Sequence, residues 1–238
     1  MQFTTDNWPL KNEQKTKQRK DLSNNYFFAL AGNIGVGKTT WTCLLSNQFD
    51  WRPYYEKVVE NPYLTDFYHD MERWSFHSQI FFLTQRFKAH LEIQRTTSTC
   101  IQDRTIFEDG EIFAWNLYKN NIMSEKDYQN YKDLYQTIIG SLRFPDLIIY
   151  LRASIWTLIS RIRKRGRDYE KAINKEYLAQ LNQAYEDWIK RYTKQHRVLI
   201  IDTDDLDIEK DTSRINEIVM KIGLYETQMK LFPRMSEI

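Results

Sequence analysis

Gly32–Thr39 reads GNIGVGKT, and the short apolar run Tyr26–Ala31 stands before it. The chain holds only seven glycines, and three of them fall inside this octapeptide, at Gly32, Gly35 and Gly37. Glycine adopts positive φ at no steric cost, so a chain otherwise poor in glycine has placed it where the backbone must turn tightly. The octapeptide fits G-x-x-x-x-G-K-[ST], the Walker A pattern, whose backbone N–H groups surround phosphate oxygens. The sequence therefore predicts a phosphate-binding loop between a buried strand and a helix.

The residues of this loop predict an ATP site. We expect Lys38 to reach the β- and γ-phosphates and Thr39 to ligate Mg²⁺. The helix that starts near Lys38 would point the positive end of its dipole at the phosphates. A glycine turn that binds nothing is the alternative, and the strand before the loop and the helix after it argue against that alternative. The candidate ATP-binding residues of this segment are Gly32, Asn33, Ile34, Gly35, Val36, Gly37, Lys38, Thr39 and Thr40.

Apolar runs and helical patterns alternate on both sides of the loop. The expected strands cover residues 26–31, 54–59, 99–102, 147–151 and 198–201. The expected helices cover residues 38–48, 62–95 with a break near Asp70, 109–119, 124–141 with Ser124 and Asp127 as its cap, 154–164, 175–192 and 207–222. Short apolar strands separated by helices are typical of a parallel sheet covered on both faces. We predict one α/β domain at 25–225, between a disordered polar tail at 1–24 and a C-terminal tail at 226–238.

Composition excludes several classes of protein. The chain has 34 Lys and Arg against 32 Asp and Glu, and a net charge of +2 does not favour a nucleic-acid partner held by bulk charge. Its two cysteines cannot build a disulfide framework and are typical of a reducing compartment. No apolar run approaches the roughly 20 residues of a membrane helix. We therefore expect a cytoplasmic protein that binds neither nucleic acid nor membrane. The four histidines lack metal-ligand spacing, so no zinc site is expected.

Charged side chains follow the second and third expected strands. Ligands of α/β folds bind outside the carboxyl ends of the strands, so these side chains are candidates for chemistry. Glu56, with Glu60 four residues on, could take a proton from a hydroxyl that attacks the γ-phosphate. The alternative for either is a solvated acid. Asp103 could hold Mg²⁺ and Arg104 could orient the acceptor, or the two could be a helix cap and a surface arginine.

An arginine-rich run, Arg161–Arg167, ends the helix expected at 154–164. Its glycine would permit a mobile loop, and its arginines could close on phosphates during phosphoryl transfer. A nucleic-acid patch is the competing interpretation, which the balanced net charge disfavours. After the fifth strand, the acids of residues 202–205 could cap the last helix, while the backbone near Asp205 could frame an adenine.

Five stretches in this order resemble the deoxyribonucleoside kinases, most closely their bacterial deoxyadenosine/deoxyguanosine kinase branch. They are Gly32–Thr39, Glu56–Tyr63 with Phe67 and Tyr68, Arg73–Gln79 with Arg86, Asp103–Asp109, and Arg161–Glu170. A Walker A pattern alone is generic, whereas the ordered set is specific, and the resemblance covers roughly residues 26–222. The chain departs from the family at Lys57, because the family motif normally reads Glu-Pro-Val.

The resemblance implies a role for each matched residue. It makes Glu56 the catalytic base and places Asp103 near Mg²⁺. It implies that Arg104 holds this base and the 5′-hydroxyl, and that Tyr68 and Glu170 grip the sugar 3′-hydroxyl. Gln79, Arg86 and Asp109 fall on positions that hydrogen-bond the nucleobase, and Phe113 falls on one that stacks against it. Arg161, Arg165 and Arg167 fall on the lid. The implied catalytic set is Glu56, Arg104, Lys38, Arg165 and Arg167; the ATP contacts add Arg161, Arg165 and Asp205.

These observations predict a P-loop kinase fold with an arginine-rich lid and a Mg·ATP-dependent deoxyribonucleoside kinase. The expected product is a deoxynucleoside 5′-monophosphate made for nucleotide salvage, with a purine deoxynucleoside as the preferred acceptor. The alternatives are a broad or pyrimidine-preferring member, a nucleoside monophosphate kinase, and a non-catalytic subunit with a kinase fold. The resemblance also implies a homodimer.

Overall fold

The computed structural model describes residues 25–208 and 210–231, so the predicted tail at 1–24 lies outside the described residues. Five strands form one sheet in the order β2-β3-β1-β4-β5. All four neighbouring pairs run parallel, as predicted. The strands are β1 (Phe27–Ala31), β2 (Arg52–Tyr54), β3 (Cys100–Asp103), β4 (Leu147–Arg152) and β5 (Val198–Asp202).

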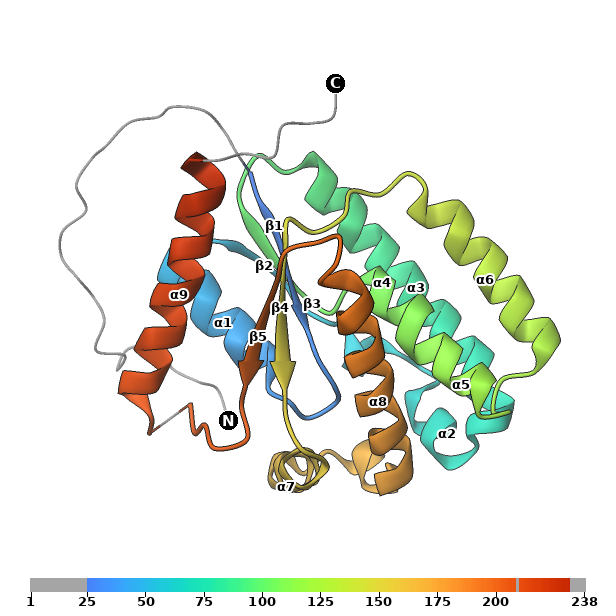
Figure 1. Cartoon of the computed structure of the whole chain (residues 1–238). Coiled ribbons are helices and arrows are strands. Elements are labelled where there is room, and N and C mark those ends of the chain that lie inside the picture. The colour runs from blue at the N-terminus through green and yellow to red at the C-terminus, as the bar shows by residue number, and fades with distance from the viewer. Residues whose placement is uncertain (1–24, 209, 232–238) are drawn as a thin grey trace.

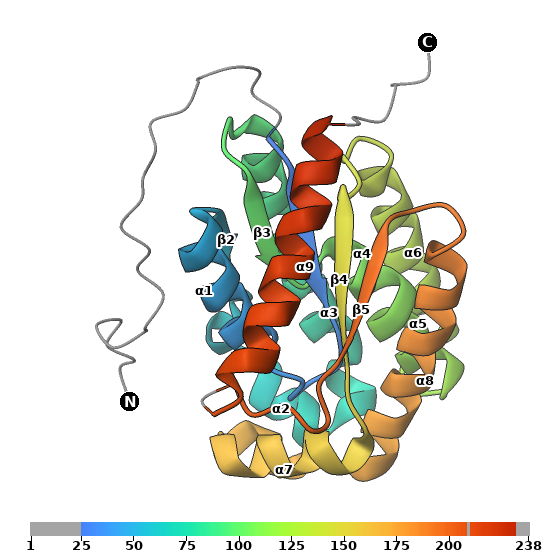
Figure 2. The same ribbon diagram turned by 60° about the vertical axis from the view of Figure 1, so that its left-hand side comes forward.

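Helices cover both faces of this sheet (Figures 1 and 2). The α-helices are α1 (Lys38–Phe49), α2 (Leu64–His69), α3 (Met71–Arg95), α4 (Ile106–Glu108), α5 (Trp115–Lys119), α6 (Glu125–Ile139), α7 (Ile155–Arg165), α8 (Lys175–Tyr192) and α9 (Thr212–Leu231). A π-helical segment, η3 (Asp109–Ala114), joins α4 to α5. Two short 3-10 segments are η2 (Val58–Glu60) and η4 (Asp168–Ala172).

Alternation along β1 divides the core into two layers. Phe28 and Leu30 point toward α1 and α9, where they join a cluster that contains Trp41 and Ile215. The intervening alanines, such as Ala29, face the cluster formed with α3, η3, α6 and α8. Successive side chains of a strand point to opposite faces, so an apolar run of this kind is buried on both sides.

The carboxyl ends of the strands meet at one edge of the sheet, at the bottom of Figure 1. The loop between β1 and α1 lies at this edge, and α7 and α2 border it (Figure 1). This is the position at which ligands bind in open α/β sheets.

The predicted second strand, 54–59, is wrong. The strand ends at Tyr54, which pairs with Gln102, and Val58–Glu60 forms a 3-10 turn instead. β2 is an edge strand that pairs only with β3, through three residues, and its Pro53 is tolerated there because an edge strand can lack one N–H. The chain then leaves the sheet, and Glu56 forms ion pairs instead of ladder hydrogen bonds.

The last helix also differs from its prediction. It runs over Thr212–Leu231 rather than 207–222, so the predicted tail boundary at residue 226 falls inside α9. The acids after β5 do not cap this helix: Asp202 pairs with Arg152, and Asp204 accepts from the backbone N–H of Ser154. The predicted break near Asp70 is confirmed, because its carboxylate accepts from the N–H of Arg73 at the start of α3.

Candidate active site

The glycines of Gly32–Thr39 have the backbone conformations that the pattern predicts. Gly32, Gly35 and Gly37 have φ values of 144°, 86° and 104°. A Cβ on Gly32 would lie 2.6 Å from the carbonyl oxygen of Leu151, and a Cβ on Gly35 would lie 2.7 Å from the Ile162 side chain. Both the dihedral angles and the close packing therefore require glycine at these two positions.

Lys38 lies buried inside this loop. Its Nζ donates to the carbonyl oxygens of Gly32 at 2.9 Å and Asn33 at 3.2 Å. Burial, together with the nearby Arg104, lowers the pKa of Lys38 to about 8. The ammonium is therefore held by neutral carbonyl groups, an environment in which phosphate oxygens would be far stronger partners.

Thr39 and Asp103 come together at the start of α1. Thr39 Oγ1 donates to Asp103 Oδ2 at 2.7 Å. The other carboxylate oxygen, Oδ1, is buried and has no hydrogen-bond partner among the residues that the structure describes. A hydroxyl beside a carboxylate with a free oxygen is a donor set suited to Mg²⁺, which prefers oxygen ligands. Burial raises the pKa of Asp103, and a bound cation would favour its ionised form.

The two candidate glutamates, Glu56 and Glu60, lie in different environments. Glu56 Oε1 lies 2.6 Å from Arg86 Nη2 and 3.3 Å from Arg104 Nη1. Burial raises the pKa of Glu56, but Arg104, Arg86 and Lys38 outweigh it and hold that pKa at about 2. The Glu60 side chain is 58% exposed and pairs with Lys57. Only Glu56 therefore belongs to the buried charge cluster.

Arg104 adopts a strained backbone conformation that aims its side chain into this cluster. Its φ is 63°, which side-chain-bearing residues rarely adopt, and its N–H donates to the carbonyl oxygen of Leu30. Its guanidinium carbon lies 4.2 Å from the centre of the Phe113 ring. Phe113, predicted to stack on a nucleobase, thus packs against a catalytic candidate through a cation–π contact.

The predicted nucleobase residues lie on α3 and the start of η3. Gln79 and Arg86 stand seven residues apart on α3, so they share one face of the helix. Arg86 Nε lies 2.7 Å from Asp109 Oδ2, and all three side chains are buried. Gln79 Oε1 has no partner within the described part of the chain. Burial raises the pKa of Asp109 to about 7, against the opposing effect of Arg86.

The predicted sugar and lid residues are joined to each other. Arg165 donates through Nε and Nη2 to both carboxylate oxygens of Glu170, at 3.0 and 2.6 Å. Arg167 Nη1 lies 3.6 Å from the same carboxylate and donates to the Tyr169 hydroxyl. Tyr68 is near enough for Glu170 to raise its pKa, after burial and Tyr177. The structure thus brings Glu170, Tyr68 and the lid arginines together.

Arg161 has a different place from the other lid arginines. Its guanidinium donates to the carbonyl oxygens of Val36, Thr203 and Leu206 and to the Thr203 hydroxyl. It therefore ties the phosphate-binding loop to the turn after β5. Asp205, in this same turn, is exposed, and its carbonyl oxygen accepts from Arg214. In this structure the Arg161 side chain therefore holds the backbone of the phosphate-binding loop, whereas Arg165 and Arg167 bond to Glu170.

Two side chains, one of the loop itself and one outside it, hold the loop in ways that the motif analysis did not identify. The Asn33 side chain donates to the Leu178 carbonyl oxygen and to Asn182, which fastens the loop to α8. Glu108 accepts from the N–H of Gly32. The spacing of Thr105 and Glu108 is that of a capping box, a signal that could have found Glu108.

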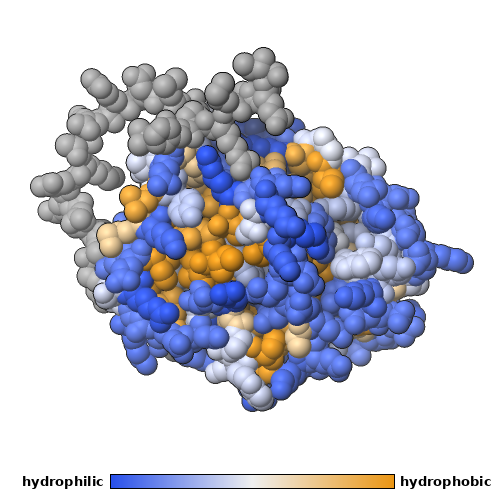
Figure 3. All heavy atoms as spheres, in the orientation of Figure 1, coloured by the Kyte–Doolittle hydropathy of each residue, from blue (hydrophilic) through white to orange (hydrophobic). Residues whose placement is uncertain are grey.

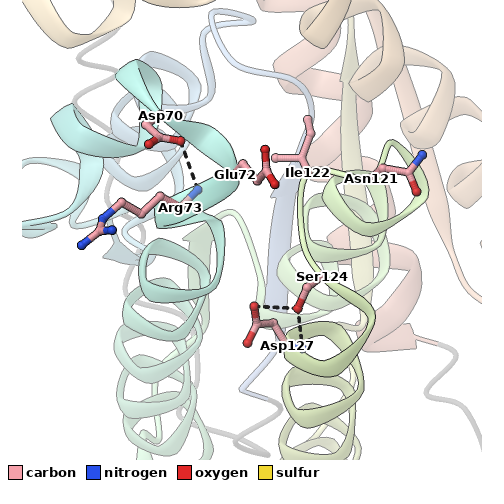
Figure 4. A pocket seen from close by; sticks show the side chains of 7 residues that line it. All are labelled: Asp70, Glu72, Arg73, Asn121, Ile122, Ser124 and Asp127. Atoms are coloured by element: carbon pink, nitrogen blue, oxygen red, sulfur yellow. Dashed lines mark hydrogen bonds between the residues drawn. The ribbon is translucent and has the colours of Figure 1, made fainter.

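A surface hollow of about 490 Å³ lies between the starts of α3 and α6, and none of the candidate site residues discussed above lines it (Figure 4). Its lining residues are Asp70, Glu72, Arg73, Asn121, Ile122, Ser124 and Asp127. Asp70 caps α3, and Ser124 caps α6 by accepting from the N–H of Asp127, as predicted. The side chains of Asp70 and Ser124 therefore serve the two helix ends. Among the described residues, no helix is long and apolar enough to cross a membrane.

Comparison with known proteins identifies the family. The family model described as deoxynucleoside kinase matches residues 28–225. The deoxyadenosine/deoxycytidine kinase of Bacillus subtilis is 36% identical over 213 residues, which cover 88% of this chain and 98% of that protein. The deoxyguanosine kinase of the same organism is 34% identical over 82% of this chain and 95% of its own length. A more distant relative is human mitochondrial thymidine kinase 2, 31% identical over 83% of this chain and 76% of its own.

A solved structure agrees with the sequence relatives. Deoxyadenosine kinase from M. mycoides with bound dATP has a TM-score of 0.74 and 34% identity, over 84% of this chain and 100% of that one. The family and the P-loop kinase fold expected from the motifs are thereby confirmed. The chain belongs to the deoxynucleoside kinase family and is an ATP-dependent kinase of deoxynucleosides.

Proposed function

We propose that this enzyme transfers the γ-phosphate of ATP to the 5′-hydroxyl of deoxyadenosine or deoxyguanosine, in nucleotide salvage. The observation that carries the purine preference is the buried arrangement of Gln79, Arg86 and Asp109 beside Glu56. It offers both donors and acceptors to a purine edge, and sites built to hydrogen-bond a substrate reject unsuitable analogues strongly. The names of the purine deoxynucleoside kinases among the relatives support the same preference.

In this proposal Glu56 accepts the proton of the 5′-hydroxyl as that oxygen attacks the γ-phosphate. Its low pKa keeps it ionised, and Arg104 beside it would orient the attacking hydroxyl. Lys38 would move from the carbonyl oxygens of its loop to the phosphates, because its ammonium group forms stronger hydrogen bonds with charged oxygens than with neutral ones. Arg165 and Arg167 would stabilise the charge spread over the transferring phosphoryl group.

We propose that Thr39 and Asp103 hold Mg²⁺. Their oxygens adjoin, and Asp103 Oδ1 is free to accept a further partner. When bound with ATP, this ion would neutralise phosphate charge during transfer. For the sugar, we propose that Tyr68 and Glu170 hold the 3′-hydroxyl, since both lie at the lid and Glu170 is buried with its carboxylate already bonded to Arg165.

We also propose that the enzyme is a cytoplasmic homodimer without a nucleic-acid or membrane partner. The balanced charge of the chain and the resemblance to the family support this. Light scattering coupled to size-exclusion chromatography would give about twice the 28.9 kDa of one chain if the dimer forms.

The substrate proposal is tested by measuring kcat/KM for all four deoxynucleosides, with ADP formation as the readout. Deoxyadenosine or deoxyguanosine should give the highest value. Deoxycytidine is the pyrimidine expected to come next, since one relative is named a deoxyadenosine/deoxycytidine kinase. A tenfold preference for thymidine or deoxycytidine would contradict the purine preference and leave the kinase activity intact.

One further acceptor separates the remaining alternatives. Deoxyadenosine monophosphate should not be phosphorylated, because Gln79, Asp109, Tyr68 and Glu170 suit a neutral acceptor. Faster ADP formation with the monophosphate than with any deoxynucleoside would identify a nucleoside monophosphate kinase. Absence of ADP formation with every acceptor would identify a non-catalytic protein.

A further inference from the structure

Glu108 is a fully buried carboxylate between the phosphate-binding loop and α8. It is the last residue of α4, and its exposed fraction is 0%. Oε2 accepts from the backbone N–H of Gly32 at 3.4 Å and from the Tyr185 hydroxyl at 2.7 Å. Oε1 accepts from the backbone N–H of Thr105 at 2.9 Å. One side chain therefore joins three segments that are far apart in sequence.

A capping box explains only half of these bonds. The helix cap needs Oε1 of Glu108 on the N–H of Thr105, and the Thr105 hydroxyl also reaches this oxygen. Oε2 serves Gly32 and Tyr185, which lie outside α4. All of these donors are uncharged, and a buried carboxylate held by neutral donors is costly for the folded state. A cap on the surface would stabilise the helix at less cost, so the position of Oε2 calls for another role.

The two groups that Glu108 joins belong to opposite sides of the reaction. The carbonyl oxygen of Gly32 accepts from Lys38, on the side of the phosphate donor. Thr105 directly follows Arg104, whose guanidinium lies 3.3 Å from Glu56 on the acceptor side. The carboxylate therefore sets the position of the first glycine of the loop relative to the turn that carries Arg104.

We propose that Glu108 is a positioning residue that aligns the γ-phosphate of the donor with the 5′-hydroxyl of the acceptor. It acts through Gly32 and Thr105. A misplacement of about 1 Å between reacting groups can lower the rate by about 10²-fold. Loss of this alignment should therefore appear in kcat rather than in either KM. The proposal rests on the phosphoryl transfer described above, and is independent of which nucleobase is preferred.

Glu108→Gln is the direct test, because the amide has the same shape. Its carbonyl oxygen can still accept from Thr105, and its NH₂ group can donate to the Tyr185 hydroxyl, but this NH₂ group cannot accept from the Gly32 N–H. We expect kcat to fall at least tenfold, with KM for ATP and for the best deoxynucleoside within threefold of the parent. Tyr185→Phe should lower kcat less. The double variant should be no slower than Glu108→Gln alone, because both changes disrupt one unit.

Glu111→Gln is the matched control. Glu111 lies three residues further along the chain, and its carboxylate accepts from Tyr135 at 3.1 Å and Trp188 at 3.1 Å. These bonds anchor η3 to α6 and α8, so this variant should lower Tm and leave kcat unchanged. Measuring Tm for each variant separates a lost anchor from a lost alignment.

The proposal is overturned if Glu108→Gln keeps kcat within twofold while Tm falls, since it would then behave like Glu111→Gln. It is also overturned if KM for ATP rises tenfold with kcat unchanged. If Glu108→Gln does not fold, Tyr185→Phe decides, and an unchanged kcat there rejects the proposal. All ratios use whichever deoxynucleoside the parent phosphorylates best, so an incorrect purine preference would not affect the outcome.

Discussion

Arg86 Nη2 lies 2.6 Å from Glu56 Oε1, so the arginine assigned to the nucleobase is bonded to the proposed catalytic base. The other edge of the same guanidinium, at Nε, lies 2.7 Å from Asp109. In the proposed mechanism, recognition of the nucleobase and activation of the 5′-hydroxyl therefore share one buried guanidinium. If the nucleobase binds Arg86 and Asp109 as proposed, the choice of acceptor and the turnover rate should be linked through the contact of Arg86 with Glu56.

Arg86→Met should raise the pKa of Glu56, because Arg86 lowers it through charge and a hydrogen bond. An opposite charge at this distance lowers a carboxylate pKa by about 1–3. From about 2, this shift would place the pKa of Glu56 in the variant at about 3–5. As the pH is lowered from 6, the kcat of the variant should therefore begin to fall at a higher pH than the kcat of the parent, because Glu56 gains a proton earlier. Lys57→Met is the control, because Lys57 pairs with Glu60 instead. A kcat profile of Arg86→Met that falls at the same pH as the profile of the parent would contradict the linkage.

Glu56→Gln should lower kcat by about 10²–10⁴, the usual effect of removing a general base. This corresponds to about 3–5 kcal/mol of activation free energy. Binding of the deoxynucleoside, measured by calorimetry, should change little. Glu60→Gln should turn over like the parent, because its side chain is exposed and bonded to Lys57. The assignment is wrong if Glu60→Gln loses turnover and Glu56→Gln does not.

Arg165→Ala and Arg167→Ala should each lower kcat at least tenfold with the fold unchanged, as measured by Tm and circular dichroism. Their guanidiniums lie at the carboxylate of Glu170, and in the proposed mechanism they stabilise the charge of the transferring phosphoryl group. Lysine should restore only part of the rate, because a point charge cannot reproduce a two-pronged contact. Arg163→Ala, on the exposed side of α7, is the matched control. If the alanine variants turn over as fast as the parent, these arginines have no role in phosphoryl transfer and are part of a solvated helix end.

Lys38 should make stability depend on pH at the alkaline end. The pKa of Lys38 is 10.5 when the side chain is fully solvated, as in the unfolded chain, and about 8 in the folded protein. The unfolded chain therefore binds more protons between these values, and stability rises with pH across this window. Compared with Lys38→Met, the parent should gain Tm between pH 7.5 and pH 10. A difference in Tm that stays constant between these pH values would show that the lysine is not buried as the structure places it.

The phosphate-binding loop and most of the sheet were predictable from local chemistry. The glycines of Gly32–Thr39 permit the positive φ values that this turn requires, and the apolar runs at β1 and β4 are buried in the core. The run at β5 is also a strand, but it lies at the edge of the sheet, where Ile200 is exposed. Helix starts with a side-chain cap, such as Ser124 for α6, were equally evident. Each of these features depends on residues that are neighbours in the chain.

The end of β2 depends on tertiary contacts. Tyr54–Val59 has the composition of a strand, but its partner β3 ends and the ion pairs of Glu56 draw the chain away from the sheet. The start of α9 is similar, because Asp204 accepts from Ser154 on another element and does not cap the helix that follows. Propensity alone cannot anticipate such distant partners.

The choice between Glu56 and Glu60 also depends on tertiary contacts and not on local sequence. Both are acids after one strand, and their spacing does not distinguish them, whereas the fold places Glu56 against two guanidiniums and Glu60 against solvent. Glu108 likewise has a local signature as a cap, but its bond to Gly32 joins residues 76 apart in sequence. Turn geometry and apolar runs are local properties that a sequence carries. The partners of a buried charge are selected only when the chain closes on itself, because burial makes each unpaired charge too costly to keep.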